Sequence, residues 1–525
     1  MTKDAAAEIG KAYAFEGPAL ELGALVLDGE AHPESRVRVP LSMLNRHGLV
    51  AGATGTGKTK TLQLIAEQLS AAGVPAFLAD IKGDVSGMAA PGEPSDRITS
   101  RAKDTATDWA PTGFPAEFLS LGGVGEGVPV RATITSFGPL LLSKVLGLNE
   151  TQESSLGLVF HFADKAGLPL LDLKDLRAVI THLTSDEGEA DLKELGGLAS
   201  ATAGVILREL ITLETQGGEA FFGEPEFDSA DLLRVAEDGR GVLSIMGLAG
   251  LQDRPKLFST FLMWLLADLF QDLPEVGDVD KPKLVFFFDE AHLLFDDASE
   301  AFLEAITRTV RLIRSKGVGV FFVTQTPKDV PGDVLAQLGN RVQHALRAFT
   351  PDDAKALKAT VGTFPTSDVF DLEELLTQLG IGEAVVTIMS ERGAPTPVAW
   401  TRMRPPASLM AQLPADQHAA IVAASDLLDD YGTAVDRESA YERLLARVAP
   451  APETEPAPAE RAPEPEAPRD DDEPGAVAKV LGSSVFKSFA RAAATAAGRE
   501  ISRSIFGTGR RTTRRRTTKR RGSTW

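Results

Sequence analysis

The sequence feature that most constrains the fold is a glycine-rich stretch, GATGTGKT, at residues 52–59. A short apolar run, residues 49–51, precedes it, and apolar residues at helical spacing follow it up to Gly73. A strand, such a loop and a helix form a phosphate-binding site, because the glycines let backbone N–H groups point at phosphate oxygens. We predict that Lys58 meets the β- and γ-phosphates and that the Thr59 hydroxyl binds Mg²⁺. The predicted nucleotide-binding residues are Gly52, Ala53, Thr54, Gly55, Thr56, Gly57, Lys58, Thr59 and Lys60.

A second nucleotide signal is the acid pair Asp289-Glu290, which ends an apolar run at residues 284–288. An aspartate at a strand tip can support Mg²⁺ beside a phosphate loop, and an adjacent glutamate can take a proton from attacking water. Together with the loop, the pair predicts ATP hydrolysis, with Asp289 at the metal and Glu290 as the catalytic base. Gln325 follows the apolar run 318–323 and would face the γ-phosphate if that strand neighbours the Asp289 strand.

The charged turn Asp80-Ile-Lys82-Gly-Asp84 ends another apolar strand. Open α/β sheets bind ligands at the carboxyl ends of their strands, so this turn is a candidate ligand site. A solvated charged turn explains the same residues equally well.

Three arginines, Arg308, Arg311 and Arg314, recur along the helix expected at residues 299–315. Such a run is ordinarily a solvated helix face. The alternative is that Arg314, near the helix end, reaches the nucleotide of a neighbouring subunit. That alternative follows from the chain's organisation, since no second sheet-forming domain is expected after residue 405 to supply the other wall of a cleft. We therefore expect a homo-oligomeric ring if the protein is a motor.

Composition limits the other possibilities. With 43% hydrophobic residues, 24% charged residues and no cysteine, we expect a globular protein without disulfides or thiolate metal sites. The N-terminus carries acids and no apolar core, so we expect no secretory signal. The apolar run 257–270 is short and contains Asp268, which favours a buried helix over a membrane span. We expect a cytoplasmic protein without integral membrane association.

The order of apolar runs predicts an α/β fold, with a parallel sheet flanked by helices and an inserted α-helical subdomain. A stretch rich in proline, alanine and acids predicts a disordered linker near the C-terminus. The expected divisions are a small β-rich lead-in at 1–40, a first part of the ATPase core at 41–135, the helical insertion at 136–237, a second part of the core at 238–405, a helical extension at 406–448, the linker at 449–474, an amphipathic helix at 475–506 and a basic tail at 507–525.

Taken together, these motifs resemble those of the HerA/FtsK-type ring ATPases, and specifically the bacterial HerA-like helicase family. The resemblance spans about residues 20–405 and is carried by residues 45–59, 78–84, 287–292 and 323–327. It implies a RecA-like P-loop NTPase core in a hexameric ring that pumps or unwinds double-stranded DNA through a central pore.

The resemblance also implies residue roles. Lys58 and Thr59 would bind nucleotide and Mg²⁺, Asp289 would support the metal, and Glu290 would be the catalytic base. Arg314, with Arg46, matches positions at which such rings place arginines that act across the subunit interface.

The charge distribution leaves the partner open. The net charge is −20, yet residues 510–521 hold eight basic residues and no acid. This tail could bind nucleic-acid phosphates without sequence preference, tether the chain to anionic lipid, or fold back on the acidic body. Three functions follow as alternatives: a ring motor on double-stranded DNA, an ATPase that drives protein assembly or secretion through a protein partner, and an ATP-binding scaffold that hydrolyses slowly.

Overall fold

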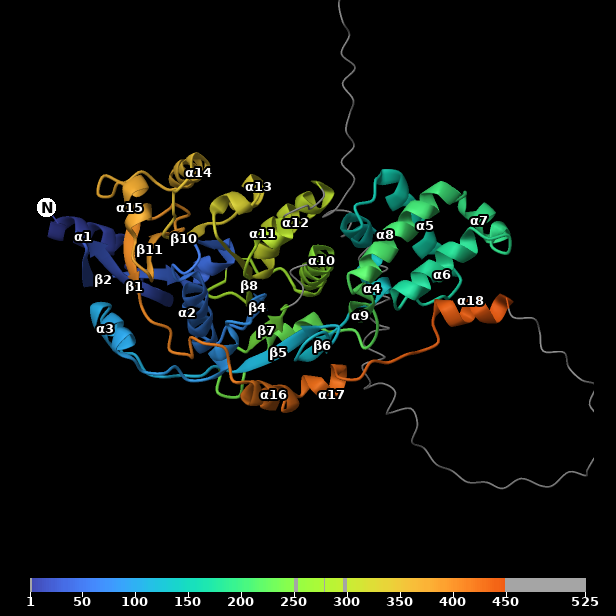
Figure 1. Cartoon of the computed structure of the whole chain (residues 1–525), viewed down its shortest axis with the longest axis horizontal. Helices are drawn as coiled ribbons and strands as arrows, with labels where there is room; N and C mark the ends of the chain where they lie inside the picture. The colour runs from blue at the N-terminus through green and yellow to red at the C-terminus, as the bar shows by residue number, and fades with distance from the viewer. Residues whose placement is uncertain (1, 250–253, 278, 296–299, 449–525) are drawn as a thin grey trace, which may run out of the picture.

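The structure is a computed structural model that describes residues 2–249, 254–277, 279–295 and 300–448 (Figure 1). The predicted linker, amphipathic helix and basic tail lie outside the described residues. The strands are β1 (Ala19–Leu27), β2 (Glu30–Pro40), β3 (Gly48–Ala51), β4 (Ala76–Asp80), β5 (Ala116–Leu121), β6 (Val128–Val130), β7 (Leu243–Gly247), β8 (Leu284–Phe288), β9 (Val318–Thr324), β10 (Asn340–His344), β11 (Glu383–Thr387) and β12 (Ala399–Met403).

The helices divide into those that cover the sheet, those inserted between β6 and β7, and those that follow β12. They are α1 (Thr2–Ala12), α2 (Lys58–Ala71), α3 (Asp96–Asp104), α4 (Ile134–Val145), α5 (Glu150–Lys165), α6 (Leu173–Leu183), α7 (Glu189–Leu195), α8 (Ser200–Thr215), α9 (Gly218–Phe221), α10 (Pro255–Asp272), α11 (His292–Phe295), α12 (Glu300–Ile313), α13 (Gly332–Leu335), α14 (Pro351–Val361), α15 (Leu372–Gln378), α16 (Ala415–Ala423), α17 (Leu427–Tyr431) and α18 (Ala440–Val448).

One 12-stranded sheet forms the centre, in the order β2-β1-β12-β11-β10-β3-β9-β8-β4-β7-β5-β6. From β10 to β6 every neighbouring pair is parallel, whereas β2, β1, β12 and β11 add an antiparallel edge. The strands of the predicted lead-in, β1 and β2, therefore join the same sheet as the nucleotide motifs, through the pairing of β1 with β12. The predicted class, an α/β fold with a largely parallel sheet, is confirmed.

The central strands are buried on both faces, which explains their unbroken apolar sequence. In β8, Phe286 and Phe288 belong to the core that includes α10 and α12, while Val285 and Phe287 belong to the core that includes α2. Successive side chains of a strand point to opposite faces, so a run of apolar residues fills both cores at once. Figure 1 shows α10–α12 and α2 on opposite sides of these strands.

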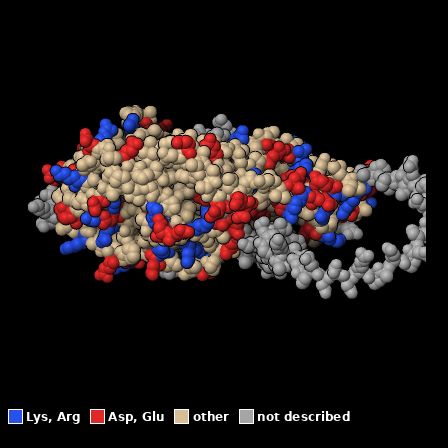
Figure 2. Space-filling model, turned by 90° about the horizontal axis from the view of Figure 1, so that it is seen from below, with Lys and Arg blue, Asp and Glu red and all other residues tan. Residues whose placement is uncertain are grey.

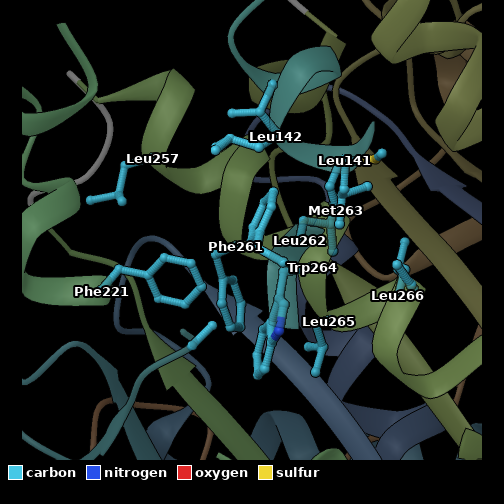
Figure 3. Close-up of a cluster of buried hydrophobic side chains, with 14 of the residues drawn as sticks. Leu141, Leu142, Phe221, Leu257, Phe261, Leu262, Met263, Trp264, Leu265 and Leu266 are labelled. Carbon is cyan, nitrogen blue, oxygen red and sulfur yellow. The ribbon is translucent and has the colours of Figure 1, made fainter. Parts of the chain in front are cut away.

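Helix α10 contributes a continuous run of buried residues, 260–267, to the core, and the sequence interpretation of a core helix holds for it. Trp264 is 1% exposed, and Phe221 meets both Phe261 and Trp264 edge-on, with ring centroids 6.0 and 5.8 Å away. Figure 3 shows this aromatic group packed beside Leu141 and Leu142 of α4. Within the described ranges, no helix combines the length and hydrophobicity that crossing a bilayer requires.

The inserted helices α4–α9 gather in a lobe at one end of the molecule (Figure 1). The segment after β12 returns across the core, and α18 then packs against α6 of this lobe. Its first residues cross α2: the Glu67 carboxylate accepts hydrogen bonds from Ala407 N and Ser408 N at 2.9 and 3.2 Å. The predicted helical extension is thus tied to the helix that follows the phosphate loop.

Several elements differ from the sequence expectations. Helix α1 and the short strands β5 and β6 were not expected from the residue pattern.

Candidate nucleotide site

The glycine-rich loop connects β3 to α2 in the conformation that its glycines permit. Gly52, Gly55 and Gly57 have φ of 154°, 79° and 117°, a region that residues with a Cβ rarely adopt. At Gly52 a Cβ would lie 2.5 Å from the Cβ of His344, so no larger residue fits. The loop surface at Thr54 and Gly55 is exposed, and Ala53, Gly57 and Thr59 are half-buried. The predicted strand, loop and helix are therefore present with an accessible loop.

Lys58, the first residue of α2, lies over the loop. Its ammonium donates to Gly52 O at 2.7 Å and to Ala53 O at 3.3 Å, and the residue is 7% exposed. Burial lowers the pKa of Lys58, although the charges of nearby acids, Glu290 first, act in the opposite direction. The ammonium is thus held inside the loop, where the sequence places the β- and γ-phosphates.

Lys60 is directed elsewhere. Its ammonium donates to Met410 O at 2.6 Å and to the Gln63 side chain at 3.3 Å. The side chain therefore holds the segment after β12 against α2. In this arrangement the Lys60 ammonium is turned away from the loop, so only the backbone of Lys60 is placed to bind a nucleotide.

The strand order brings distant motifs to one edge of the sheet. β9 lies between β3 and β8, and β4 lies on the other side of β8, all parallel. The phosphate loop, Gln325, Asp289 and the 80–84 turn follow the carboxyl ends of these strands. Gln325 directly follows β9 and is exposed. Its predicted role required that β9 neighbour the Asp289 strand, and β9 does pair with β8.

Asp289 presents one free carboxylate oxygen in a buried place. Its Oδ1 accepts from Glu290 N at 2.9 Å, whereas Oδ2 has no hydrogen-bond partner among the described residues, and the residue is 3% exposed. Burial, followed by the charge of Glu290, raises the pKa of Asp289 to about 6. Mg²⁺ takes oxygen ligands and is commonly held by one or two protein groups together with phosphates and water. The Asp289 carboxylate and the Thr59 hydroxyl are oxygen donors of this kind, so these residues fit the ion.

Glu290 is held in an unusual backbone conformation, with φ of 48°. Its Oε1 accepts a hydrogen bond from the Lys82 ammonium, and His292 Nδ1 lies 3.3 Å from Oε2. Burial alone would raise the pKa of Glu290, but the hydrogen bond and charge of Lys82 outweigh it and hold this pKa below its ordinary value. At neutral pH the side chain is therefore a carboxylate, the form that a general base requires.

The sequence did not decide whether the 80–84 turn is a ligand site or a solvated turn. In the structure, one of its residues shapes the turn and another contacts the site. The Asp80 carboxylate accepts from Gly83 N at 2.7 Å and from Val85 N at 3.2 Å, which shapes the turn. Lys82 instead reaches out to Glu290. The turn is thus both a structural feature and part of the site.

His344, at the end of β10, is a site neighbour that sequence reasoning missed. Its Nδ1 donates to Glu383 O at 2.8 Å, because a carbonyl can only accept, and its Nε2 then accepts from the Thr61 hydroxyl at 2.8 Å. Complete burial lowers the pKa of His344 to about 4, so the ring is neutral. The Cβ of His344 lies against the loop at Gly52, and its ring lies close to Gly57. A lone histidine at the end of a strand in which only Val342 is apolar gave no signal of this contact.

Arg314 and Arg46 lie at the opposite edge of the sheet. Arg314 opens the turn Arg314–Lys316 before β9, and Arg46 ends the turn Leu41–Arg46 before β3. The seven residues of β9 span about 20 Å, so Arg314 is far from the loop of its own chain. Between the arginines lies the buried His47, whose Nδ1 accepts from Val320 N at 3.0 Å. Burial, with the charges of Arg314 and Arg46, lowers the pKa of His47 to about 4.

Of the other two arginines, Arg308 is paired with Glu304 at 3.5 Å along the helix and Arg311 is exposed. Both fit the solvated helix face that the sequence also allowed.

The sequence profile of the family described as helicase HerA-like C-terminal matches residues 26–515. No curated protein matches the chain. Among solved structures, it is similar to the unbound bacterial conjugative coupling protein TrwBdeltaN70, at 16% identity, with 77% of this chain and 94% of that chain covered and a TM-score of 0.49. TrwB in complex with ADP and Mg²⁺ is similar at 16% identity, with 75% and 99% covered and a TM-score of 0.48. VirB4 of Thermoanaerobacter pseudethanolicus is similar at 13% identity, with 74% and 97% covered and a TM-score of 0.45.

At these identities and TM-scores the structural similarities alone assign no function. The family match, in contrast, covers most of the chain and includes both nucleotide motifs at their shared sheet edge. The protein therefore belongs to the helicase HerA-like C-terminal family and is a P-loop ATPase.

Proposed function

We propose that the protein is an ATP-hydrolysing ring motor that translocates or unwinds double-stranded DNA as a homo-oligomer, expected to be a hexamer in the cytoplasm. The observation that carries this proposal is the separation of Arg314 from the phosphate loop by the length of β9. An arginine at that edge can meet a nucleotide only where another subunit presents its loop. Each nucleotide would then lie between two copies of the chain.

Within such a site the residues have distinct tasks. The amides of residues 52–59 and the Lys58 ammonium hold the phosphates, and Glu290 takes the proton from the attacking water. Asp289 and Thr59 would hold Mg²⁺, which when bound neutralises charge on the β- and γ-phosphates. Gln325 faces the γ-phosphate from β9, and the neighbour's Arg314, with Arg46 beside it, would stabilise the charge that develops in transfer.

Mixing two inactive variants tests the shared site. In Lys58→Ala subunits the loop is defective but the arginine edge is intact, and in Arg314→Ala subunits the reverse holds. Each variant alone should hydrolyse ATP slowly, while an equimolar mixture should recover a measurable part of the rate, because some interfaces join an intact loop to an intact edge. A mixture with no more activity than its components, under conditions in which subunits demonstrably exchange, would refute the shared site.

The DNA substrate is tested by the ATPase rate with and without duplex DNA. Phosphate contacts make binding strongly salt-dependent, so retention on DNA should be clear at low salt and fall as salt rises. Stimulation by duplex DNA of any sequence supports the proposal. No stimulation, together with no retention at low salt, would overturn it.

A protein partner is the second candidate, and the chain's charge favours it. The net charge is −20, and on the face seen in Figure 2 acidic and basic groups are intermixed around a broad area with few charged residues. An acidic surface repels nucleic acid unless basic residues line the contact. Stimulation of ATP hydrolysis by a co-purified protein, with DNA inactive, would favour an ATPase that drives assembly or secretion.

A further inference from the structure

Lys82 lies in the charged turn 80–84, to which the proposed function assigns no role. It lies in the turn after β4, whose shape is fixed because the Asp80 carboxylate accepts from Gly83 N and Val85 N. Gly83 has φ of 76°, the left-handed conformation that lets the turn close beneath this carboxylate. The backbone around Lys82 is thus fixed by the hydrogen bonds between Asp80, which precedes it, and Gly83 and Val85, which follow it.

From this turn the Lys82 side chain crosses to the tip of the neighbouring strand. Ala79 of β4 pairs with Phe288 of β8, so Lys82 and Glu290 follow adjacent, registered strand ends. The ammonium donates to Glu290 Oε1; the Lys82 side chain is 41% exposed and that of Glu290 is 7% exposed. A surface ion pair is usually weak, but here the acceptor is buried and the donor comes from a fixed turn.

The two oxygens of Glu290 are consequently different. Oε1 is bound to Lys82. Within the part of the chain that the structure describes, Oε2 has no hydrogen-bond partner, and His292 Nδ1 lies 3.3 Å from it. A glutamate carboxylate can rotate about three side-chain bonds, and a base that is free to rotate is seldom aligned with its water. Because the hydrogen bond from Lys82 fixes Oε1, it also fixes the direction in which Oε2 points.

We propose that Lys82 is a positioning residue for hydrolysis: it holds Oε1 of Glu290 so that Oε2 receives the proton of the attacking water. In this step the water oxygen forms a bond to the γ-phosphorus while the bond to the β–γ bridging oxygen breaks. ADP leaves with that electron pair, and the water proton moves to Oε2. The inference rests on the proposed function, in which Glu290 is the base.

The test compares the full-length wild type with Lys82→Met, Lys82→Arg, Glu290→Gln and the double variant Lys82→Met/Glu290→Gln. Steady-state ATP hydrolysis without DNA gives kcat and KM, and fluorescent mant-ATP measures nucleotide binding. Misplacing a catalytic group by about 1 Å can cost about 100-fold, so Lys82→Met should lower kcat by about 10- to 100-fold with little change in KM or mant-ATP affinity. Lys82→Arg should recover most of this loss, because it restores a cation that can bind Oε1.

The double variant separates positioning from general damage. If Lys82 acts only through Glu290, adding Lys82→Met to Glu290→Gln should reduce kcat no further. A further loss, an unchanged kcat, a raised kcat in Lys82→Met, or a rise in KM alone would each overturn the inference. If Glu290→Gln hydrolyses ATP as fast as wild type, the assignment of the base fails instead; if Glu290→Gln is inactive and Lys82→Met is normal, only the role of Lys82 fails.

Discussion

The tips of β4 and β8 look alike in sequence and differ in chemistry. In both, an apolar run leads into an aspartate: Asp80 is the last residue of β4, and Asp289 directly follows β8. Because Ala79 pairs with Phe288, the two aspartates occupy equivalent positions on neighbouring strands. Both are buried, at 2% and 3% exposure, and burial is the main cause that raises the pKa of each to about 6. The pattern of an apolar run followed by an acid therefore does not by itself distinguish a ligand-binding residue from a structural one.

What distinguishes them is the backbone that follows. After Asp80, Gly83 lets the chain turn back so that two backbone amides reach the carboxylate. After Asp289 the chain continues into Glu290 and α11, and no described residue forms a hydrogen bond with Oδ2. A buried carboxylate oxygen without a partner is costly to fold, which indicates a function outside the fold.

The largest expected effect is on catalysis at the β8 tip. Glu290→Gln keeps the shape of the side chain but removes its ability to take a proton. General-base catalysis contributes about 10²–10⁴-fold, so kcat should fall by that amount while mant-ATP still binds. Asp333→Asn, an exposed acid on α13, is the matched control and should leave kcat unchanged. A Glu290→Gln enzyme with a normal rate would place the base elsewhere and remove the contrast between the two tips.

The sequence was sufficient for features that depend on local pattern. The strand, loop and helix around Lys58, the apolar β8 before Asp289 and the core helix α10 are all set by neighbouring residues, and the structure has them. Helix α1 was missed because its few apolar residues give little periodicity. Strand β6 was missed because it has only three residues, and β5 because Glu117 and Ser120 interrupt its apolar residues.

Contacts between distant residues could not be predicted in this way. His344 packs against the phosphate loop, and Glu67 binds the backbone of Ala407, only because the sheet order and the returning segment bring them together. Lys82 was identified as a charged turn residue, but its bond to Glu290 depends on β4 and β8 being neighbours and in register. The residue pattern of a single sequence determines neither the order of these strands nor their register.

The next effect is on stability at the β4 tip. Asp80→Ala removes the acceptor of two backbone amides, and a buried donor without a partner costs about 1–3 kcal/mol. We expect Asp80→Ala to lower the free energy of unfolding by about 2 kcal/mol more than Asp289→Ala does, since Asp289 accepts only from its neighbour's amide. Urea unfolding of both variants under identical conditions measures this difference. Equal losses would show that the two aspartates have the same structural role.

A smaller effect concerns Mg²⁺. Asp289→Asn removes the charge that would attract the ion but keeps one oxygen, and changes around metal sites typically cost about 10- to 100-fold in affinity. The Mg²⁺ concentration for half-maximal ATP hydrolysis should therefore rise at least about tenfold in Asp289→Asn. Asp80→Asn is the control at the equivalent position, and its Mg²⁺ dependence should equal that of wild type. If both variants shift together, the ion is not bound by Asp289 in particular.

The smallest expected effect is a difference in the free energy of unfolding between variants at the two strand tips, measured without nucleotide or metal. In EDTA, Asp289→Asn exchanges a buried carboxylate for a neutral group and loses no hydrogen bond from another element, so the free energy of unfolding should rise by about 1 kcal/mol. Asp80→Asn also removes a buried charge, but its new NH₂ group must face the N–H of Gly83 or Val85, and two donors cannot bond to each other. We therefore expect Asp80→Asn to be less stable than wild type by about 1 kcal/mol. The midpoints of urea unfolding should move in opposite directions for the two substitutions. A shift of both in the same direction would mean that burial of charge, and not the backbone after each aspartate, decides what these residues do.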